Sequence, residues 1–224
     1  MTLVSISSVG ASPIAQYTLN TADIGEFASV GSGATTGQAG KFDQAYNFAG
    51  GANNLTTIPA GVVPSGSAER TISIWFNQTA DQAGLQDKLF GYGAGTSGNA
   101  IDISLEDGSL RLRHFGGNIT YGQNFDFDGT DAGWHHLAVR VNASASTFAD
   151  VDVFLDGTKL SVTGTGGGGT GVTLNTTDSA FGIGTTTITA SSSNTQGFNG
   201  LLDELQIFDS ALTHLEVATL ALLD

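Results

Sequence analysis

Four closely spaced residues, Asp126, Asp128, Gly129 and Asp131, place three carboxylates around a glycine. Proteins bind calcium through about six to eight oxygens from carboxylates, carbonyls and water. These carboxylates could supply part of such a shell, although the segment lacks the glutamate that closes an EF-hand loop. Two interpretations are open, because spacing alone does not separate a calcium loop from a solvated turn before the next strand.

Two adjacent histidines, His135 and His136, have the chemistry of zinc ligands. A zinc site needs ligands that converge on one ion. Neighbouring residues of a β-strand point to opposite faces of the sheet, so these two side chains should not share a metal. We expect one histidine in the interior and the other outside.

Glycosidic bond hydrolysis needs two carboxyl groups that lie about 5–9 Å apart. A Glu-x-Asp-x-x-Glu array on a strand would supply such a pair, because residues i and i+2 face the same way. Asp203 and Glu204 are adjacent, so a strand would direct them to opposite faces. The remaining glutamates form no such array: Glu26, Glu69, Glu106 and Glu216. We therefore expect no catalytic residues, and the protein is predicted not to be an enzyme.

A ligand face is predicted around one tyrosine. Glycans bind to β-sandwiches through an exposed aromatic ring, with polar side chains nearby for the sugar hydroxyls. Tyr121 lies beside a glycine, with Asn118 and Gln123 close in the sequence and with Arg111 and Arg113 on the preceding strand. These five residues are the predicted ligand-binding set. The alternative is that they only pack within a hairpin.

Composition excludes several classes of partner. The 224 residues include 7 basic and 21 acidic side chains, for a net charge of −14. Nucleic-acid binding needs clustered lysine and arginine, and an anionic membrane surface attracts the same residues, so neither partner is expected. No apolar run is long enough to insert into a membrane. Cysteine is absent, which excludes disulfides and thiolate chemistry.

The elements that must position these residues are short strands. Apolar and polar residues alternate, and Asp107-Gly108 and Asp156-Gly157 have the turn chemistry of tight hairpins. Many short strands with such turns favour an all-β sandwich or barrel. A capping-box pattern from Thr213 begins a short C-terminal helix. The predicted strands include residues 71–76, 100–105, 110–115, 134–141 and 149–155.

Four motifs, in the right order, resemble one family. The run Trp-His-His-Leu-Ala-Val at 134–139, followed by 153–160, resembles a hairpin of the laminin-G-like domains of the concanavalin A type. Residues 198–212 are similar to the closing strand of that family, and 45–59 and 70–76 to earlier strands. The resemblance covers about residues 14–222. It implies one domain over 1–224, folded as an antiparallel two-sheet jelly-roll sandwich, in a family of mostly non-catalytic binding modules.

The resemblance also implies a structural role for one acidic residue. In the family pattern the residue that matches Asp203 is an anchor, which holds an ion or accepts backbone N–H bonds. We expect Asp203 to reach the N-terminal loop near Asp23, with a structural calcium ion between them. The alternative is a carboxylate satisfied by backbone donors alone. The calcium-binding loop motif of the family is not matched cleanly at 20–26.

Two functions are open at this stage. The first is a non-catalytic recognition or adhesion module that binds a glycan or a cell-surface polysaccharide. The second is a virion structural protein, such as a capsid decoration or head-fibre protein, which would bind capsid or fibre proteins or associate with itself. The first fifteen residues carry no basic residue of a secretory signal. An extracellular or virion-surface location is expected from the acidic, lysine-poor composition.

Overall fold

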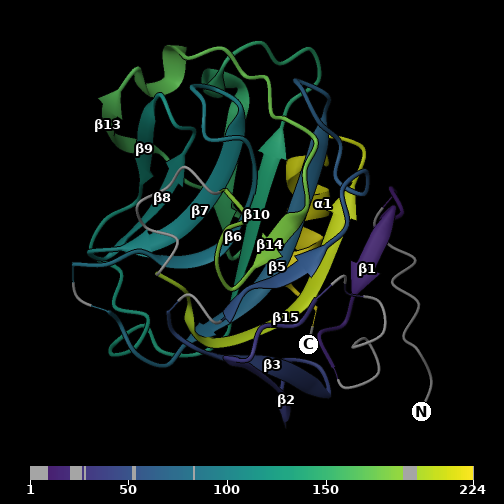
Figure 1. Ribbon diagram of the computed structural model, residues 1–224, viewed down its shortest axis with the longest axis vertical. Helices are drawn as coiled ribbons and strands as arrows, with labels where there is room; N and C mark the ends of the chain where they lie inside the picture. The colour runs from purple at the N-terminus through teal and green to yellow at the C-terminus, as the bar shows by residue number, and fades with distance from the viewer. Residues whose placement is uncertain are drawn as a thin grey trace.

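The computed structural model describes residues 10–20, 27, 29–51, 54–82, 84–188 and 196–223. Within these ranges the strands form two antiparallel sheets, and one short helix follows the last strand (Figure 1). The predicted two-sheet antiparallel jelly-roll sandwich with a short C-terminal helix is confirmed. None of the helices in these ranges is both long and apolar enough to cross a membrane.

The larger sheet has eight strands, and its central strands are neighbours in space but distant in sequence. Strand β1 (Ala15–Tyr17) pairs with β15 beside the main path. The order along that path is β12 (Thr158–Lys159), β11 (Val151–Leu155), β10 (His135–Val141), β5 (Arg70–Gln78), β15 (Asn199–Phe208), β3 (Gln44–Ala49) and β2 (Ala34–Ala39).

The second sheet has seven strands, and the chain runs through its first five in reverse order. The spatial order is β13 (Val162–Gly167), β9 (Gly117–Tyr121), β8 (Ser109–Arg113), β7 (Ala100–Glu106), β6 (Asp87–Gly93), β14 (Phe181–Ile183) and β4 (Thr56–Ile58). Two short 3-10 helices lie at one side of the sandwich, η3 (Phe148–Asp150) and η4 (Gly169–Gly171).

The core lies between the sheets and is built from alternate residues of the central strands. Ile72, Ile74 and Phe76 of β5 are buried in the same cluster as Ile101 and Ile103 of β7. Each such side chain contributes about 1.5–3 kcal/mol when it is fully removed from water. The strand predicted at residues 71–76 and the alternation predicted for 100–105 are therefore confirmed.

The helix α1 (His214–Ala221) covers part of the outer face of the eight-stranded sheet. Val217 and Leu220 pack in a second, smaller cluster with Ala138, Phe154 and Phe208. Ala138 and Phe154 are directly paired on β10 and β11, so they present one surface to the helix. The helix thus buries an apolar patch that this sheet would otherwise expose.

Local contacts define the start of α1 and the turn beneath it. The Thr213 Oγ1 atom accepts a hydrogen bond from the Glu216 backbone N–H at 3.2 Å, and Glu216 Oε2 accepts one from Thr213 N–H at 2.7 Å. The predicted capping box is confirmed.

In the tight turn before β12, Asp156 has φ 48° and Gly157 has φ 75°. A Cβ atom at Gly157 would lie 2.9 Å from the Ala218 Cα atom, so glycine allows the close approach of the helix.

Candidate functional site

Polar side chains cross the outer face of the seven-stranded sheet in two rows. Residues directly opposite each other on neighbouring strands share one face of a sheet. On β8, Leu110 and Leu112 face the core, and the residues between them face outward. The first row, from β7 to β9, is Asp102, Arg113 and Asn118, and the second row is Ser104, Arg111 and Thr120.

One carboxylate joins the two arginines of these rows. Glu106 Oε1 accepts a hydrogen bond from Arg111 Nη1 at 2.6 Å, and Glu106 Oε2 accepts one from Arg113 Nη2. Arg113 Nη1 also donates to Ser104 Oγ at 2.6 Å. The arginine side chains retain 24% and 17% of their exposure, so each is held in place and still reached by solvent. Two cations and one anion leave a net charge of +1 here.

We call this surface the Arg111 face, and its half-buried members are Glu106, Arg111, Arg113, Asn118 and Thr120. Ser104, which accepts a hydrogen bond from Arg113, is fully buried. On the next strand, β13, Gly164 pairs with Thr120 and Gly166 pairs with Asn118. A Cβ atom at Gly166 would lie 2.9 Å from Asn118 Nδ2. Because these glycines have no side chains, β13 adds a flat margin to the face, on which an extended ligand could lie.

A buried ion pair marks the other margin of the Arg111 face. Lys88 Nζ lies 2.5 Å from Asp102 Oδ2, and the two side chains are only 0% and 1% exposed. Beside this pair, Thr186 covers Gly91, where a Cβ atom would lie 2.5 Å from Thr186 Oγ1. Gly91 is directly opposite Asp102. The polar outer face is therefore covered at β6 and open from β8 to β13.

The predicted exposure of Tyr121 is wrong. Tyr121 pairs with Leu110, whose side chain faces the core, and it is only 2% exposed. Its Oη atom donates a hydrogen bond to the Val151 carbonyl oxygen at 3.3 Å. Because the side chains of a strand alternate, Thr120 faces outward beside Arg111, and Tyr121 faces inward. The ring is therefore not available for stacking on a sugar from the Arg111 face.

Of the other four predicted ligand-binding residues, three lie on the Arg111 face and one lies outside it. The structure brings Arg111, Arg113 and Asn118 together on the Arg111 face. Gln123 is exposed, but it lies beyond the end of β9 and outside the two rows.

Sequence reasoning missed Ser104, Glu106 and Thr120. The Asp107-Gly108 turn predicts that β7 pairs with β8, and this pairing would have placed Ser104 and Glu106 beside the two arginines.

The acidic segment before β10 uses its carboxylates as backbone caps. Asp126 Oδ2 accepts from the Thr130 N–H and Asp131 Oδ2 accepts from the Asp126 N–H, both at 2.9 Å. Asp128 Oδ2 accepts from the Asp81 N–H at 2.8 Å. No group of three or more metal-ligating side chains occurs in the part of the chain that the structure describes. These contacts fit a solvated turn, and calcium in this segment stays a prediction.

The contacts of Asp203 match the alternative in which backbone donors satisfy it. Asp203 Oδ2 accepts from the Phe42 N–H and Asp203 Oδ1 accepts from the Glu204 N–H, both at 2.9 Å. Burial raises the pKa of Asp203 to about 7, against the lowering effect of the Phe42 N–H. Asp23 lies outside the described residues, so the predicted calcium site between Asp23 and Asp203 stays a prediction. These contacts do not show the oxygen shell that calcium needs.

The two histidines lie on opposite sides of β10, as predicted. His135 Nδ1 contacts Asp156 Oδ2 at 2.8 Å, and its Nε2 contacts the Asp131 carbonyl oxygen at 2.6 Å. Burial lowers the pKa of His135, but these contacts outweigh it and the net shift is upward. His136 is buried with Nε2 at 2.8 Å from Ser73 Oγ, and burial lowers its pKa to about 4. This serine–histidine pair is inaccessible to a substrate because both side chains are buried.

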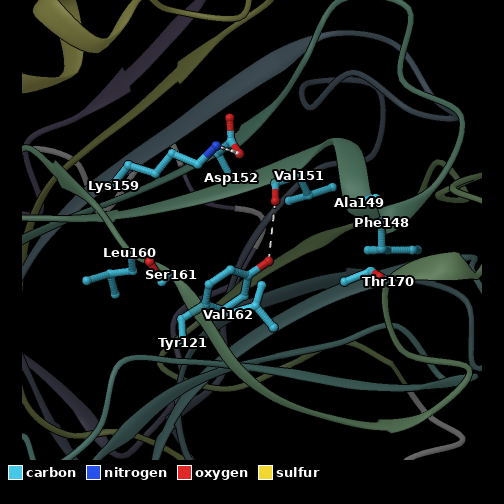
Figure 2. Close-up of a pocket in the computed structure, with 10 residues that line it drawn as sticks. All are labelled: Tyr121, Phe148, Ala149, Val151, Asp152, Lys159, Leu160, Ser161, Val162 and Thr170. Atoms are coloured by element: carbon cyan, nitrogen blue, oxygen red, sulfur yellow. Dashed lines mark hydrogen bonds and ion pairs between the residues drawn. The ribbon is translucent and has the colours of Figure 1, made fainter.

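A separate pocket of about 360 Å³ opens at one edge of the sandwich. It lies between β11 and β12 of one sheet and β9 and β13 of the other, and η3 and η4 contribute to its lining. Figure 2 shows Lys159 reaching Asp152 on one side, while Tyr121 and Val162 lie together on the other. We call it the edge pocket.

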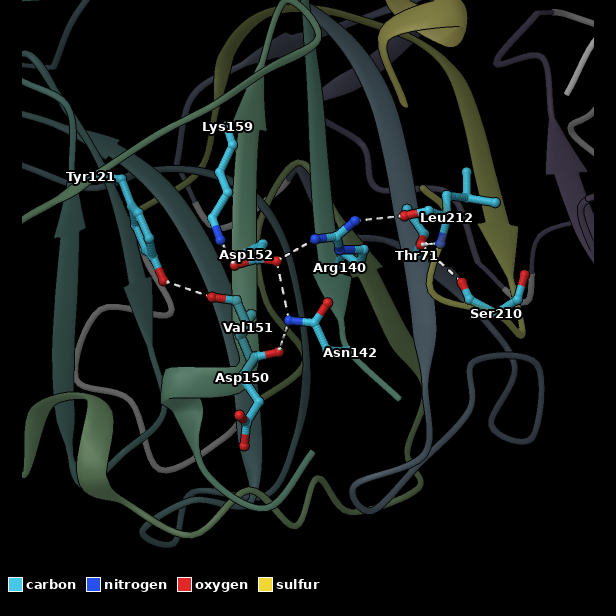
Figure 3. A network of polar contacts seen from close by, with 10 residues as sticks. All are labelled: Thr71, Tyr121, Arg140, Asn142, Asp150, Val151, Asp152, Lys159, Ser210 and Leu212. Carbon is cyan, nitrogen blue, oxygen red and sulfur yellow. Dashed lines mark hydrogen bonds and ion pairs between the residues drawn. The ribbon is translucent and has the colours of Figure 1, made fainter. Parts of the chain in front are cut away.

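The edge pocket adjoins a polar network that ends below α1 (Figure 3). Asp152 binds Lys159 and Arg140, each at 2.5 Å, and Asn142 Nδ2 at 3.1 Å. Arg140 Nη1 donates to the Leu212 carbonyl oxygen at 2.7 Å. The network therefore ties the wall of the pocket to the segment that leads into the helix.

Comparison with known proteins identifies the family. The sequence model of the concanavalin A-like lectin/glucanases superfamily, in its laminin-G form, matches residues 49–218. This span is more than half of the chain. No match to a curated protein was found.

Solved structures with the same fold include binding domains and an enzyme. Domain 4 of a GH43 extracellular arabinanase from Geobacillus stearothermophilus, in complex with arabinotriose, is 23% identical with a TM-score of 0.61, over 94% of this chain and 98% of that one. The binding domain of botulinum neurotoxin serotype G is 11% identical with a TM-score of 0.59, over 94% and 50%. Trypanosoma rangeli sialidase, with 2,3-difluorosialic acid, is 17% identical with a TM-score of 0.55, over 80% and 27%. At these identities the similarity shows the fold alone.

Proposed function

Because the chain belongs to the concanavalin A-like lectin/glucanase superfamily, we propose that it is a non-catalytic module that binds a glycan on the Arg111 face. The observation that carries this proposal is the pair of guanidinium groups that Glu106 holds on an open sheet face. The adjoining glycines of β13 leave room for a ligand to extend across the sheet.

The chemistry of the Arg111 face suits sugar hydroxyls. A hydroxyl group both donates and accepts hydrogen bonds, and the face offers guanidinium donors, a carboxylate acceptor and an amide that does both. The shared contact with Glu106 fixes Arg111 and Arg113 before a ligand arrives, which lowers the conformational entropy lost on binding. All five side chains of the face are polar, so hydrogen bonds rather than aromatic stacking would select the sugar.

The contacts of the nearby carboxylates support a role without catalysis. A glycosidase needs a carboxylic acid whose pKa is raised, so that it can protonate the leaving group. Both oxygens of Glu106 accept hydrogen bonds from arginines, so neither is free to contact the leaving group of a glycan. Asp102 is buried against Lys88 and is not reached by solvent. We therefore expect no hydrolysis of a glycan that binds here.

The neighbouring structures suggest the first ligands to try. Domain 4 of the arabinanase was solved with arabinotriose, and two of the similar structures are toxin binding domains. We propose that the natural ligand is a polysaccharide of a cell surface or matrix. Arabino-oligosaccharides are the first probes, followed by a broad glycan array.

Substitution of Asn118 tests the proposed site. We expect Asn118→Ala to weaken glycan binding by about fivefold, since one net hydrogen bond is worth about 1 kcal/mol. Arg113→Lys keeps the charge but removes the planar fork, so it should weaken binding as well. Gln38→Ala, on the exposed edge strand β2 of the other sheet, is the control.

Binding is measured by isothermal titration calorimetry with a glycan that gives a signal on the array. Equal affinity of Asn118→Ala, Arg113→Lys and the wild-type protein would exclude the Arg111 face as the site. Products released from the same glycan would refute the non-catalytic assignment, and chromatography of a long incubation detects them.

A further inference from the structure

The edge pocket and the Arg111 face both use β9 and β13, but they lie on different sides of these strands. The pocket opens where the two sheets separate at their lateral edges, whereas the Arg111 face looks outward from the seven-stranded sheet. Its volume of about 360 Å³ is at the lower end of the range for small-molecule sites. A single sugar residue is a ligand of suitable size.

The mouth of the edge pocket holds an unusual cation. The chain has seven basic residues, all within the described ranges, and Lys159 is the one that is exposed. Its side chain retains 47% of its exposure. The other six are buried or half-buried. In a protein of net charge −14, this is the basic side chain most open to an anionic ligand.

The partner of Lys159 does not cancel this charge. Asp152 is only 7% exposed, and its Oδ2 atom is already bound by Arg140 and Asn142. One carboxylate thus faces two cations, so this three-residue cluster carries one positive charge in excess. Arg140 is committed to Asp152 and to the Leu212 carbonyl oxygen, as Figure 3 shows, so the excess charge is presented through Lys159.

The rest of the lining is part apolar and part hydroxylated. Val162 is 47% exposed and lies beside the ring of Tyr121, which forms an apolar wall (Figure 2). Ser161 and Thr170 bring hydroxyl groups to the same pocket. A sugar ring has an apolar face and a hydroxylated rim, so it matches this lining better than a purely aliphatic chain.

We propose that the edge pocket is a second ligand site, which binds the end residue of an acidic glycan through its carboxylate. The carboxylate pairs with the Lys159 ammonium group, the apolar face of the ring lies on Val162, and hydroxyl groups contact Ser161 and Thr170. This inference does not require the Arg111 face to bind a glycan.

A titration followed by nuclear magnetic resonance locates the bound sugar. The full chain, labelled with nitrogen-15, is titrated with methyl glucuronide at low ionic strength. We expect the amide signals of Ser161 and Val162 to shift, and those of Asn118 and Thr120 to stay in place. Shifts confined to Asn118 and Thr120 would overturn the second site and would support the Arg111 face instead. No shift at either place would also overturn it.

Substitution of Lys159 tests the role of the charge. Lys159→Met keeps most of the side-chain length and leaves Asp152 paired with Arg140, so the network survives in part. We expect it to weaken methyl glucuronide binding about tenfold, and Lys159→Arg to restore most of the affinity. Lys41→Met is the matched control, because Lys41 lies over Trp75 on another part of the molecule.

Two further probes on the wild-type protein separate the sources of affinity. Methyl glucoside has the same ring without the carboxylate, and hexanoate has a carboxylate without the ring. We expect both to bind at least several-fold more weakly than methyl glucuronide. Equal binding of methyl glucoside would refute the role of the carboxylate, and equal binding of hexanoate would refute the role of the sugar. Failure of all three probes leaves glycan binding at the Arg111 face intact.

Discussion

Two carboxylates each bind two basic side chains, and together they hold most of the basic residues in this chain. Glu106 binds two arginines on the Arg111 face, and Asp152 binds Arg140 and Lys159 beside the edge pocket. In each case one anion positions two cations and leaves an excess positive charge on an acidic protein. Removal of the carboxylate would leave like charges close together, so these anions are structural requirements of the surfaces they support.

Asp203 makes the stability of the fold depend on pH. Its pKa in the folded protein is about 7, above the value of about 3.9 for an unfolded aspartate. Folding therefore favours the protonated carboxyl. This contribution is complete below about pH 4 and is lost as the pH rises through about 7. We expect the free energy of unfolding to fall as the pH rises from about 4 to 7 and to level off above pH 7, with about 1.4 kcal/mol of this loss between pH 6 and 8 for this one group.

Asp203→Asn should flatten that fall, because the amide does not ionise. Guanidinium denaturation at pH 6 and at pH 8 measures the difference for each variant. The control is Asp209→Asn, at an exposed position on the chain after β15. If Asp203→Asn loses as much stability between the two pH values as the wild-type protein, Asp203 is not the titrating group.

At the scale of elements, one tight turn positions both α1 and the edge strand β12. The Asp156-Gly157 turn joins β11 to β12 and supports α1 from below, through the close approach of Gly157 to Ala218. The same turn sets β12, and with it Lys159, at the edge of the sheet. A change in this turn therefore affects both the helix and the edge pocket.

Gly157→Ala should destabilise the protein through two effects. A left-handed backbone costs an L-residue about 1–2 kcal/mol, and the new methyl group would also press against Ala218. Gly61→Ala is the matched control, since Gly61 has φ 86° and no atom lies within 4 Å of the added Cβ. We expect a larger drop in melting temperature for Gly157→Ala. Equal drops would show that the contact with α1 contributes nothing.

At the scale of the whole molecule, charge and surface favour a protein that does not self-associate. The net charge is −14, and like-charged copies repel one another. Of the large hydrophobic side chains exposed in the described ranges, Leu215 and Leu222 lie two turns apart, on α1 and at its C-cap. The other three lie on separate segments: Ile14, Leu85 and Val162.

We therefore predict a monomer of 22.8 kDa in solution. Size-exclusion chromatography with light scattering measures the mass directly, at low and at physiological salt. A stable trimer or a larger ring would contradict this prediction. It would favour the alternative of a virion protein, because such proteins generally form symmetric oligomers with large buried interfaces.

The architecture could be predicted from the sequence because it depends on local and periodic signals. The β-branched and aromatic residues at 71–76 and the alternation at 100–105 identify strands, and Asp-Gly pairs identify the turns. Thr213 begins the helix with its cap. These signals act over a few residues, so no long-range information is needed to interpret them. The family resemblance, which rests on the same motifs, is confirmed over residues 49–218.

Tertiary structure alone decided which of the candidate residues meet. Glu106 joins Arg111 and Arg113 only because β7 and β8 pair in one register, and a shift of one residue would turn these side chains inward. Tyr121 is buried because its place on β9 faces the core. The edge pocket is formed by segments from both sheets, and Lys159 meets Asp152 there only after the sandwich has closed. A sequence pattern specifies the face of a residue within its own strand, whereas a site depends on which strands become neighbours.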